Sequence, residues 1–346
     1  MKQRDEPNGA FELDGAPDIP GLRFRHYRGE DDLPAMLAVI EGSRIADQND
    51  WVETLDQIKM SYRHLVNCDP REDALLVELD GSLIGYSRVF WSDEAEGNRL
   101  LCHFAILLPE QRGRGIRRAM LRWNEARLSN VRLACAVQHP HDGPVLYQCF
   151  VSEAETHWRG LLEESGYQVV RYHYEMVRPD LEAIPDLPLP DGLEVRPVRP
   201  EQIPAIWEAA REAFHDHWGY SEDEWREESY RHFAEWAQDT MDTWQIAWQD
   251  GQVAGMVQCF IDEDQNRLYG RKRGWTEGIC VRRPWRRQGL AKALIARSLR
   301  LCRERGMDHA ALGVDAENPN GAFRLYGAMG FQISKRHFIY RKPAGD

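Results

Sequence analysis

The chain has 346 residues, of which 42% are hydrophobic and 29% are charged, so it can form two globular domains with apolar cores. Its formal net charge of -12 argues against a nucleic-acid binder, which would present a basic face to phosphates. No apolar run is long enough to span a bilayer, and the polar amino-terminal stretch has no signal-peptide core. The seven scattered cysteines contain no C-x-x-C pair, which argues against a disulfide framework or a zinc ribbon. We therefore expect a soluble cytoplasmic protein without a metal and without a membrane or nucleic-acid partner.

The sequence repeats itself once, at an offset of 170 to 174 residues. Gly21-Leu-Arg-Phe-Arg returns as Gly192-Leu-Glu-Val-Arg, Asp80-Gly81 returns as Asp250-Gly251, and Arg112-Gly-Arg-Gly115 returns as Arg286-Arg-Gln-Gly289. A period this long indicates a duplicated domain. We expect a flexible tail over 1–20, one domain over 21–180, a Pro-rich linker over 181–191 and a second domain over 192–346.

The second copy shows its elements most clearly. Asp250-Gly251 lies between two apolar runs and predicts a hairpin, because both positions of such a turn need a positive φ angle. Ser221 with Glu224 resembles a capping box that opens a helix, and Gly306 is placed to end one. The expected order is a strand (193–198), helices (200–214 and 221–236), two strands around the Asp-Gly turn, a strand (274–281), a helix (287–305), a strand (309–314), a helix (318–329) and a strand from Phe331. This order predicts a mixed α/β sheet.

The segment that follows the 274–281 strand predicts an anion site. Backbone amides at a helix start attract phosphates, and Arg286 and Arg287 add positive charge. The small residues Gly289 and Ala291 would let a pyrophosphate approach the main chain. Taken alone, the pattern is more typical of a solvated turn with a helix cap.

The pattern R-x-x-G-x-A, after an Ile-x-Val strand and before Asn318 and Leu325-Tyr326-x-x-x-Gly330-Phe331, resembles the GNAT superfamily of acyl-CoA-dependent N-acyltransferases. The resemblance implies two tandem GNAT domains, with acetyl-CoA as cosubstrate. It also implies that the pyrophosphate lies on the loop Arg286, Arg287, Gln288, Gly289, Leu290 and Ala291. The pantetheine arm would bind the backbone of Ile279 and Val281, with the Ile279 N–H polarising the thioester carbonyl, and Asn318 would contact CoA. Asn318 lies eight residues before Tyr326 where the family usually has seven, so Asn320 is an alternative.

The same resemblance assigns two catalytic roles. Glu277 would share a strand face with Ile279 and act as the base that deprotonates the acceptor amine. Tyr326 matches the tyrosine that protonates the leaving thiolate. The structural alternatives are a solvent-facing or Arg273-paired Glu277, and a Tyr326 packed in the core beside Phe331.

The first copy lacks these features. Arg117 stands where the second copy has Ala291, Leu162 stands in place of Tyr326, and His103 replaces Glu277. We therefore expect the first copy to be catalytically inactive and to act as a structural partner or a lid.

The acceptor site is expected in the segment after the first helix of the second copy. Its acidic and aromatic residues, with His215, Trp218 and Tyr220 as candidate contacts, favour a cationic amine of a small molecule. The alternative is a solvated acidic helix face with core tryptophans. A non-catalytic acyl-CoA sensor, a peptidyl transferase that uses aminoacyl-tRNA, and a protein acetyltransferase remain open as functions, and so does a homodimer.

Overall fold

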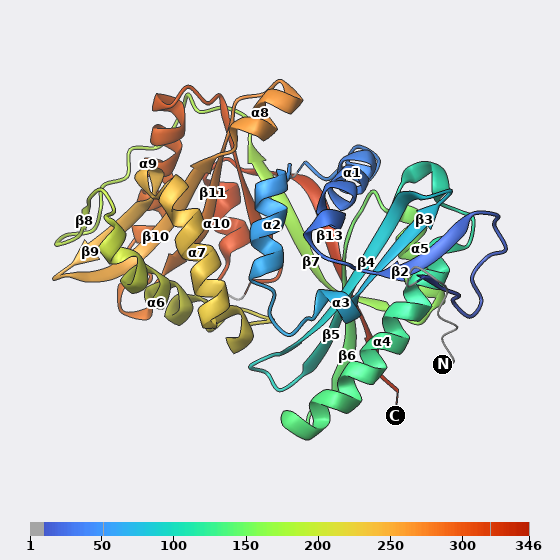
Figure 1. Cartoon of the computed structure of the whole chain (residues 1–346). Helices are drawn as coiled ribbons and strands as arrows, with labels where there is room; N and C mark the ends of the chain where they lie inside the picture. The colour runs from blue at the N-terminus through green and yellow to red at the C-terminus, as the bar shows by residue number, and fades with distance from the viewer. Residues whose placement is uncertain (1–9, 51, 319, 346) are drawn as a thin grey trace. The chain divides into compact units, whose positions relative to one another are not determined.

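The computed structural model describes residues 10–50, 52–318 and 320–345 and divides into two compact units (Figure 1). Unit 1 holds the described residues up to Val170, together with Ser221–Glu224 and the chain from Phe338 on. Unit 2 holds Arg171–Tyr220 and Trp225–His337. Each unit is described by itself below.

Unit 1 contains a sheet between two helical layers. Strands β2 to β5 pair antiparallel in chain order, and β6 joins β5 in parallel. Leu76 and Tyr86 pack with α1 and α2 on one face, whereas Leu75 and Val77 pack with α4 and α5 on the other. The elements are β1 (Ala10–Phe11), β2 (Leu22–His26), α1 (Leu33–Arg44), α2 (Leu55–Arg63), α3 (Pro70–Asp73), β3 (Ala74–Leu79), β4 (Ser82–Asp93), β5 (Arg99–Leu107), α4 (Ile116–Gln138), β6 (Val145–Ser152), α5 (Thr156–Glu164) and the beginning of β7 (Gln168–Arg178).

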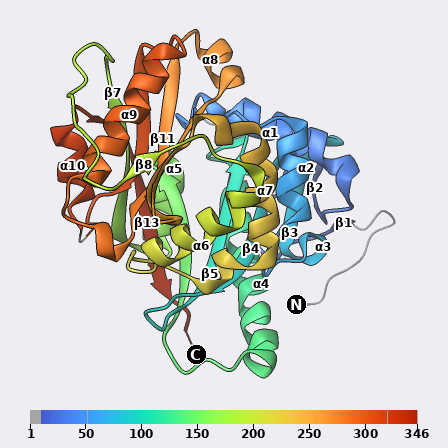
Figure 2. The same ribbon diagram turned by 90° about the vertical axis from the view of Figure 1, so that its left-hand side faces the viewer.

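Unit 2 repeats this arrangement, with β8 to β11 antiparallel and β12 parallel to β11. Figure 2 shows α9 and α10 on one side of its strands and α6 and α7 on the other. Its elements, after most of β7, are β8 (Glu194–Val195), α6 (Ile203–Phe214), α7 (Glu227–Thr240), β9 (Gln245–Gln249), β10 (Gln252–Ile261), α8 (Glu263–Tyr269), β11 (Arg273–Val281), α9 (Leu290–Glu304), β12 (His309–Asp315), α10 (Ala322–Ala328) and the beginning of β13 (Gln332–Pro343). The expected mixed α/β fold is confirmed.

The strands at the ends of the two copies cross between the units. From Arg171 on, β7 lies in unit 2, where its residues His173 to Arg178 pair antiparallel with β12. From Phe338 on, β13 lies in unit 1, where β6 is its neighbour and Ala344 donates to the Val145 carbonyl. The expected boundaries 21–180 and 192–346 describe the sequence copies and stay a prediction, whereas the compact units divide the chain differently.

The segment expected as a linker packs against unit 2. Leu181 is buried, and Ile184, Leu187 and Leu189 lie against the cluster that contains α9. The Arg300 guanidinium also donates to the Pro185 carbonyl at 2.8 Å. The three prolines favour an extended chain, and its leucines anchor that chain on the core.

Two local predictions are wrong. Ser221 does not cap a helix that runs to Trp236, because its hydroxyl accepts from the Asp223 amide and a short 3₁₀ helix, η4 (Glu222–Trp225), follows. Helix α7 begins two residues after that, at Glu227. The expected element order also lacks α8, which the Asp262 side chain caps at the Gln265 amide and which ends at Gly270 with φ 59°.

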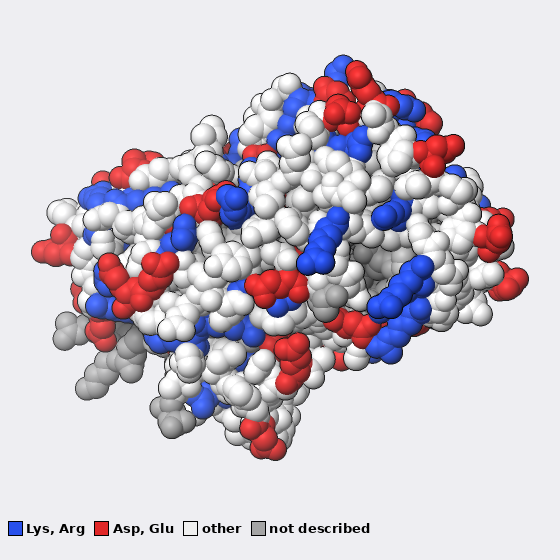
Figure 3. Space-filling view, turned by 180° about the vertical axis from the view of Figure 1, so that it is seen from behind, with Lys and Arg blue, Asp and Glu red and all other residues white. Residues whose placement is uncertain are grey.

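The surface carries both signs of charge. On the face in Figure 3, acidic and basic side chains are interspersed. Within the described ranges, none of the helices combines the length and the apolar character that crossing a bilayer needs.

Candidate active site

Strands β11 and β12 open a gap at the centre of unit 2. They pair in parallel only from Arg273 to Trp275, opposite His309 to Ala311. Beyond that point β11 carries a bulge against β10, at Gly278 with φ 57°. This left-handed φ favours glycine, and a Cβ atom at Gly278 would also lie 2.1 Å from the Gln258 Oε1 atom, so that side chain would have to move.

A turn with two left-handed residues leads from β11 into α9. Arg287 has φ 63° and Gly289, the N-cap of α9, has φ 87°. Because its N-cap residue is glycine, no N-cap side chain binds the first amides of this helix. These amides therefore remain available for an anion at the positive end of the helix dipole.

A cavity of about 490 Å³ lies at this turn. Its walls come from the end of α6, from β11, from the turn itself and from α9 and α10. It brings together eight of the expected cofactor residues: Ile279, Val281, Arg286, Arg287, Gly289, Leu290, Ala291 and Asn318. Asn320 also lines it, whereas the Gln288 side chain turns back to donate to the Pro284 carbonyl at 3.1 Å.

The guanidinium of Arg286 binds the protein itself. It donates from Nε to the Val281 carbonyl at 2.9 Å, from Nη1 to Asp216 at 2.9 Å and from Nη2 to the Ala213 carbonyl at 3.2 Å. Hydrogen bonds from Arg283 and Arg286 hold the pKa of the Asp216 carboxyl well below its usual range. Arg286 thus braces the turn against the end of α6.

Tyr326 lies on α10 and lines the cavity. Its ring also packs edge-on against Phe331, with centroids 6.3 Å apart, so it is both a core aromatic and a wall of the site. Burial raises the pKa of its hydroxyl, and Glu277 and Cys280 add to the rise. The hydroxyl is therefore protonated at neutral pH, as a proton donor must be.

Glu277 is partly buried, and its carboxylate reaches across the gap to β12. Its Oε1 atom accepts a hydrogen bond from the Gly313 amide at 2.7 Å. Burial, with a smaller contribution from Glu175, raises its pKa to about 8. The bulge at Gly278 interrupts the alternation expected to place Glu277 on one face with Ile279, and among the described residues Glu277 does not line the cavity. Arg273, an expected partner, pairs with Glu175 at 3.0 Å.

The candidate acceptor residues lie near the end of α6 but are not among the described residues of the cavity wall. The ring of His215 lies 4.8 Å from that of Tyr220, and the Arg171 guanidinium lies 5.0 Å from the ring of Trp218. His217, which is not among the expected acceptor residues, does line the cavity. No sequence pattern distinguishes His217 from His215. Only the turn that follows α6 places His217, and not His215, on the cavity wall.

These features match a known family over the part of the chain that builds the cavity. Residues 207–331 match the model of the acetyltransferase (GNAT) family. This segment is a GNAT-family acetyltransferase domain.

Two curated relatives support this assignment. N-alpha-acetyltransferase MAK3 of Arabidopsis thaliana is 28% identical over 95 residues, which span about half of that protein, 47%. Mycothiol acetyltransferase of Salinispora arenicola (strain CNS-205) is 26% identical over 326 residues, covering 90% of this chain and 94% of the relative. Two tandem GNAT copies are also the architecture of mycothiol synthase, and the match to this relative spans both copies of the chain.

Solved structures show the same fold over nearly the whole chain. A GCN5-related N-acetyltransferase from Sphaerobacter thermophilus has a TM-score of 0.68 at 23% identity, covering 96% of this chain and 98% of its own. A tandem GNAT protein from the clavulanic acid biosynthesis pathway has a TM-score of 0.64 at 16% identity, with coverage of 94% and 99%. The expected tandem GNAT architecture is therefore confirmed.

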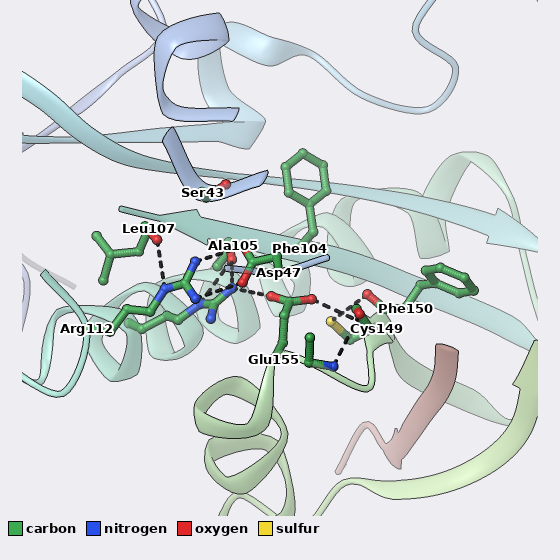
Figure 4. A network of polar contacts seen from close by, with 12 residues as sticks. Ser43, Asp47, Phe104, Ala105, Leu107, Arg112, Cys149, Phe150 and Glu155 are labelled. Carbon is green, nitrogen blue, oxygen red and sulfur yellow. Dashed lines mark hydrogen bonds and ion pairs between the residues drawn. The ribbon is translucent and has the colours of Figure 1, made fainter. Parts of the chain in front are cut away.

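The first GNAT copy keeps the framework of the turn. Gly115 caps α4 with φ 85°, as Gly289 caps α9. Arg112 donates from Nε to the Leu107 carbonyl at 3.0 Å and pairs with Asp47, repeating the contacts of Arg286 with Val281 and Asp216. Figure 4 shows Asp47, Arg112, Ala105 and Glu155 gathered at this turn.

The first copy fills the equivalent space with its own side chain. Arg117 is 2% exposed and donates to the Ala105 carbonyl at 3.1 and 2.6 Å and to Glu155 at 2.6 Å. Its guanidinium also lies 4.8 Å from the ring of Trp158. Ala105 lies two residues before the end of β5, and Ile279 lies two residues before the end of β11. In the first copy, Arg117 thus binds the strand position at which the second copy is expected to bind the pantetheine arm.

His103 and Leu162 are core residues of unit 1. A His103 ring nitrogen lies 2.9 Å from the Tyr167 hydroxyl, and Leu162 is fully buried. Burial lowers the pKa of His103 to about 3, so it stays neutral. These contacts favour the structural interpretation of both residues.

Removing Arg117 is expected to destabilise unit 1. Arg117→Ala leaves the half-buried Glu155 carboxylate without its partner, which should cost roughly 3 kcal/mol of unfolding free energy. The double variant Arg117→Ala/Glu155→Ala should lose less than the sum of the single losses. Denaturant unfolding measures these differences, with Arg118→Ala as control because its pair with Glu164 is exposed and should matter by under about 1 kcal/mol. Acetyl transfer measured below the unfolding transition should be unchanged, and a large loss of turnover there would contradict a purely structural first copy.

Proposed function

We propose that the chain is an acetyl-CoA-dependent N-acetyltransferase that acts on a primary amine of a small molecule. The observation that carries the proposal is one cavity in unit 2 that contains both an uncapped helix start and a buried, protonated tyrosine. The first feature suits a pyrophosphate and the second suits a leaving thiolate. Sequence copies 21–180 and 192–346 are proposed as the inactive and the catalytic GNAT domain.

The cosubstrate would lie along the turn and the edge of β11. The amides from Arg287 to Ala291 would hold the pyrophosphate, since Gly289 and Ala291 leave space beside the main chain. The backbone of Ile279 and Val281 would hold the pantetheine arm, because β12 no longer pairs with β11 there. Asn318 lies on the same cavity wall as a further contact.

The reaction needs a base for the amine and an acid for the thiolate. Glu277, with its pKa raised to about 8, would accept a proton from the acceptor, directly or through a water. The Ile279 amide would stabilise the oxyanion, and Tyr326 would protonate the sulfur as the C–S bond breaks.

The acceptor is proposed as a small cationic amine that approaches from the end of α6, with His215, Trp218 and Tyr220 as candidate contacts. The name of the curated relative that covers most of the chain, a mycothiol acetyltransferase, points to a small-molecule acceptor. All seven cysteines are free, which suits the reducing cytoplasm that we propose as the compartment.

Thiol release from acetyl-CoA over a panel of primary amines tests the proposal. The rate should rise with pH until about 8, as Glu277 loses its proton, and Glu277→Gln should lower kcat by about 10²-fold. Comparing variant and wild type on the same amine cancels the titration of the amine, so their ratio should flatten above pH 8. Equal kcat values at every pH would remove Glu277 from the mechanism. Saturable acetyl-CoA binding with no thiol release from any amine would favour the non-catalytic sensor instead.

A further inference from the structure

Acetyl transfer to an ammonium group releases two protons from nitrogen. One leaves before the amine attacks, and the other leaves the tetrahedral adduct after the C–N bond forms. The sulfur takes up only one proton as the C–S bond breaks. The proposed function names Glu277 for one of these losses and leaves the acceptor of the second proton unassigned.

His217 is placed on that wall by the turn after α6. It lines the same cavity as Tyr326 and Ile279. Its backbone amide donates to the Phe214 carbonyl at 2.8 Å, and its ring packs edge-on against Phe214 with centroids 4.6 Å apart. The position and the plane of the imidazole are therefore fixed by local packing.

The neighbouring residue ties His217 to the cofactor turn. Asp216 forms ion pairs with Arg283 and with Arg286, whose Nε atom binds the end of β11. Arg286 also binds the last turn of α6 through the Ala213 carbonyl. This brace fixes His217 relative to Ile279 and the helix start of α9.

The charges around His217 favour a neutral imidazole. Burial lowers the pKa of His217, and the positive charge of Arg286 lowers it further. The negative charges of Asp315, at the end of β12, and of the neighbouring Asp216 raise this pKa in part. A neutral imidazole at pH 7 has a free nitrogen lone pair and can take a proton.

We propose that His217 is a second catalytic residue of this acetyltransferase, which accepts the proton of the tetrahedral adduct. The amine nitrogen forms the C–N bond after its first proton has gone to Glu277. Its second proton passes to His217 while the C–S electron pair leaves on sulfur, which takes the hydroxyl proton of Tyr326. The imidazolium then returns its proton to the tyrosinate. The balance is one ammonium and one thioester in, and one amide, one thiol and one solvent proton out. The inference rests on the proposed function and on its assignment of Tyr326.

His217→Gln tests the role, with His309→Gln as a matched control. His309→Gln is the same substitution at the start of β12. His309 lies beside Asp308 and is not among the described residues that line the cavity. With acetyl-CoA and a reactive amine from the panel, His217→Gln should lower kcat by about 10²-fold and leave the acetyl-CoA Kd unchanged. The wild-type to variant ratio should also fall at acid pH, as the imidazole of the wild type becomes protonated.

A smaller side chain gives a test that a structural role would not pass. In His217→Ala, free imidazole added to the assay should restore part of kcat, since it can enter the space that the side chain vacates. Unchanged kcat in His217→Gln, or a loss that imidazole does not rescue and that comes with weaker acetyl-CoA binding, would overturn the proposal.

A histidine-ring NMR titration with acetyl-CoA separates this failure from failure of the proposed function. The His217 signal, assigned by its loss in His217→Gln, should shift on addition of acetyl-CoA, and the His309 signal should not. No shift, together with no thiol release by the wild type, would overturn both proposals. A shift and normal thiol release with unimpaired His217→Gln would overturn only the role of His217.

Discussion

Residues 192–346 expressed alone are expected to remain unfolded. This fragment contains the whole second GNAT copy but lacks β7, whose residues His173 to Arg178 pair with β12. Without β7, β12 becomes an open edge, and a cluster that includes the buried Met176 and Leu181 loses part of its core.

The energetic loss is large compared with the stability of a domain. Burying each of these two apolar side chains contributes about 1.5–3 kcal/mol. The fragment also loses Arg178, which donates to the carbonyls of Met329, Asp180 and Ala183, and the pair between Arg171 and Asp315. Domains are stable by only about 5–15 kcal/mol in total, so these losses together should prevent folding.

Circular dichroism and thermal unfolding show whether the fragment 192–346 is folded. Coexpression with residues 10–191, which restore β7 and Leu181, is the control and should return a cooperatively unfolding complex. A fragment 192–346 that unfolds cooperatively by itself would show that β7 is dispensable. The exchange of strands gives a physical reason for retaining a first copy whose own site is filled by Arg117.

The local structure of this fold follows from short patterns. Asp80-Gly81 and Asp250-Gly251 both adopt the positive φ angles that predicted their hairpins, at 50° and 82° and at 47° and 77°. The helix start at Gly289 was visible for the same reason, because a left-handed N-cap favours glycine.

The rest depends on contacts between distant residues. The alternation of residues in a strand indicates which face of β7 is apolar, but it does not indicate which strand will pair with β7. The sequence therefore could not predict that β7 pairs with β12 of the second copy. Ser221 has the composition of a helix cap, yet its hydroxyl lies 2.7 Å from that of Ser92, and this contact holds a turn instead. The sequence does not distinguish Gly278 from any other glycine in a strand. The bulge at Gly278, beside Gln258, is visible only in the structure, where the Glu277 carboxylate binds the Gly313 amide.

Ala291→Arg is expected to abolish acetyl-CoA binding. Ala291 lines the cavity on the first turn of α9. An arginine there would occupy the space beside the helix start, as Arg117 does at the same position of α4, where it binds the Ala105 carbonyl and Glu155. The added guanidinium would therefore fill the space that is proposed for the pyrophosphate.

Glu304→Arg provides the matched control for that variant. It places an arginine on the same helix, at the exposed last residue of α9 and far along the chain from the cavity turn. It should leave acetyl-CoA binding and thiol release unchanged. A similar loss in both variants would mean that α9 tolerates no added arginine, and the loss in Ala291→Arg would then say nothing about the cavity.

Calorimetric titration of the full chain with acetyl-CoA tests the central claim, that the cofactor binds in unit 2 and only there. The account predicts one site per chain, lost in Ala291→Arg and kept in Glu304→Arg. Two sites per chain, or one site that survives in Ala291→Arg, would contradict it.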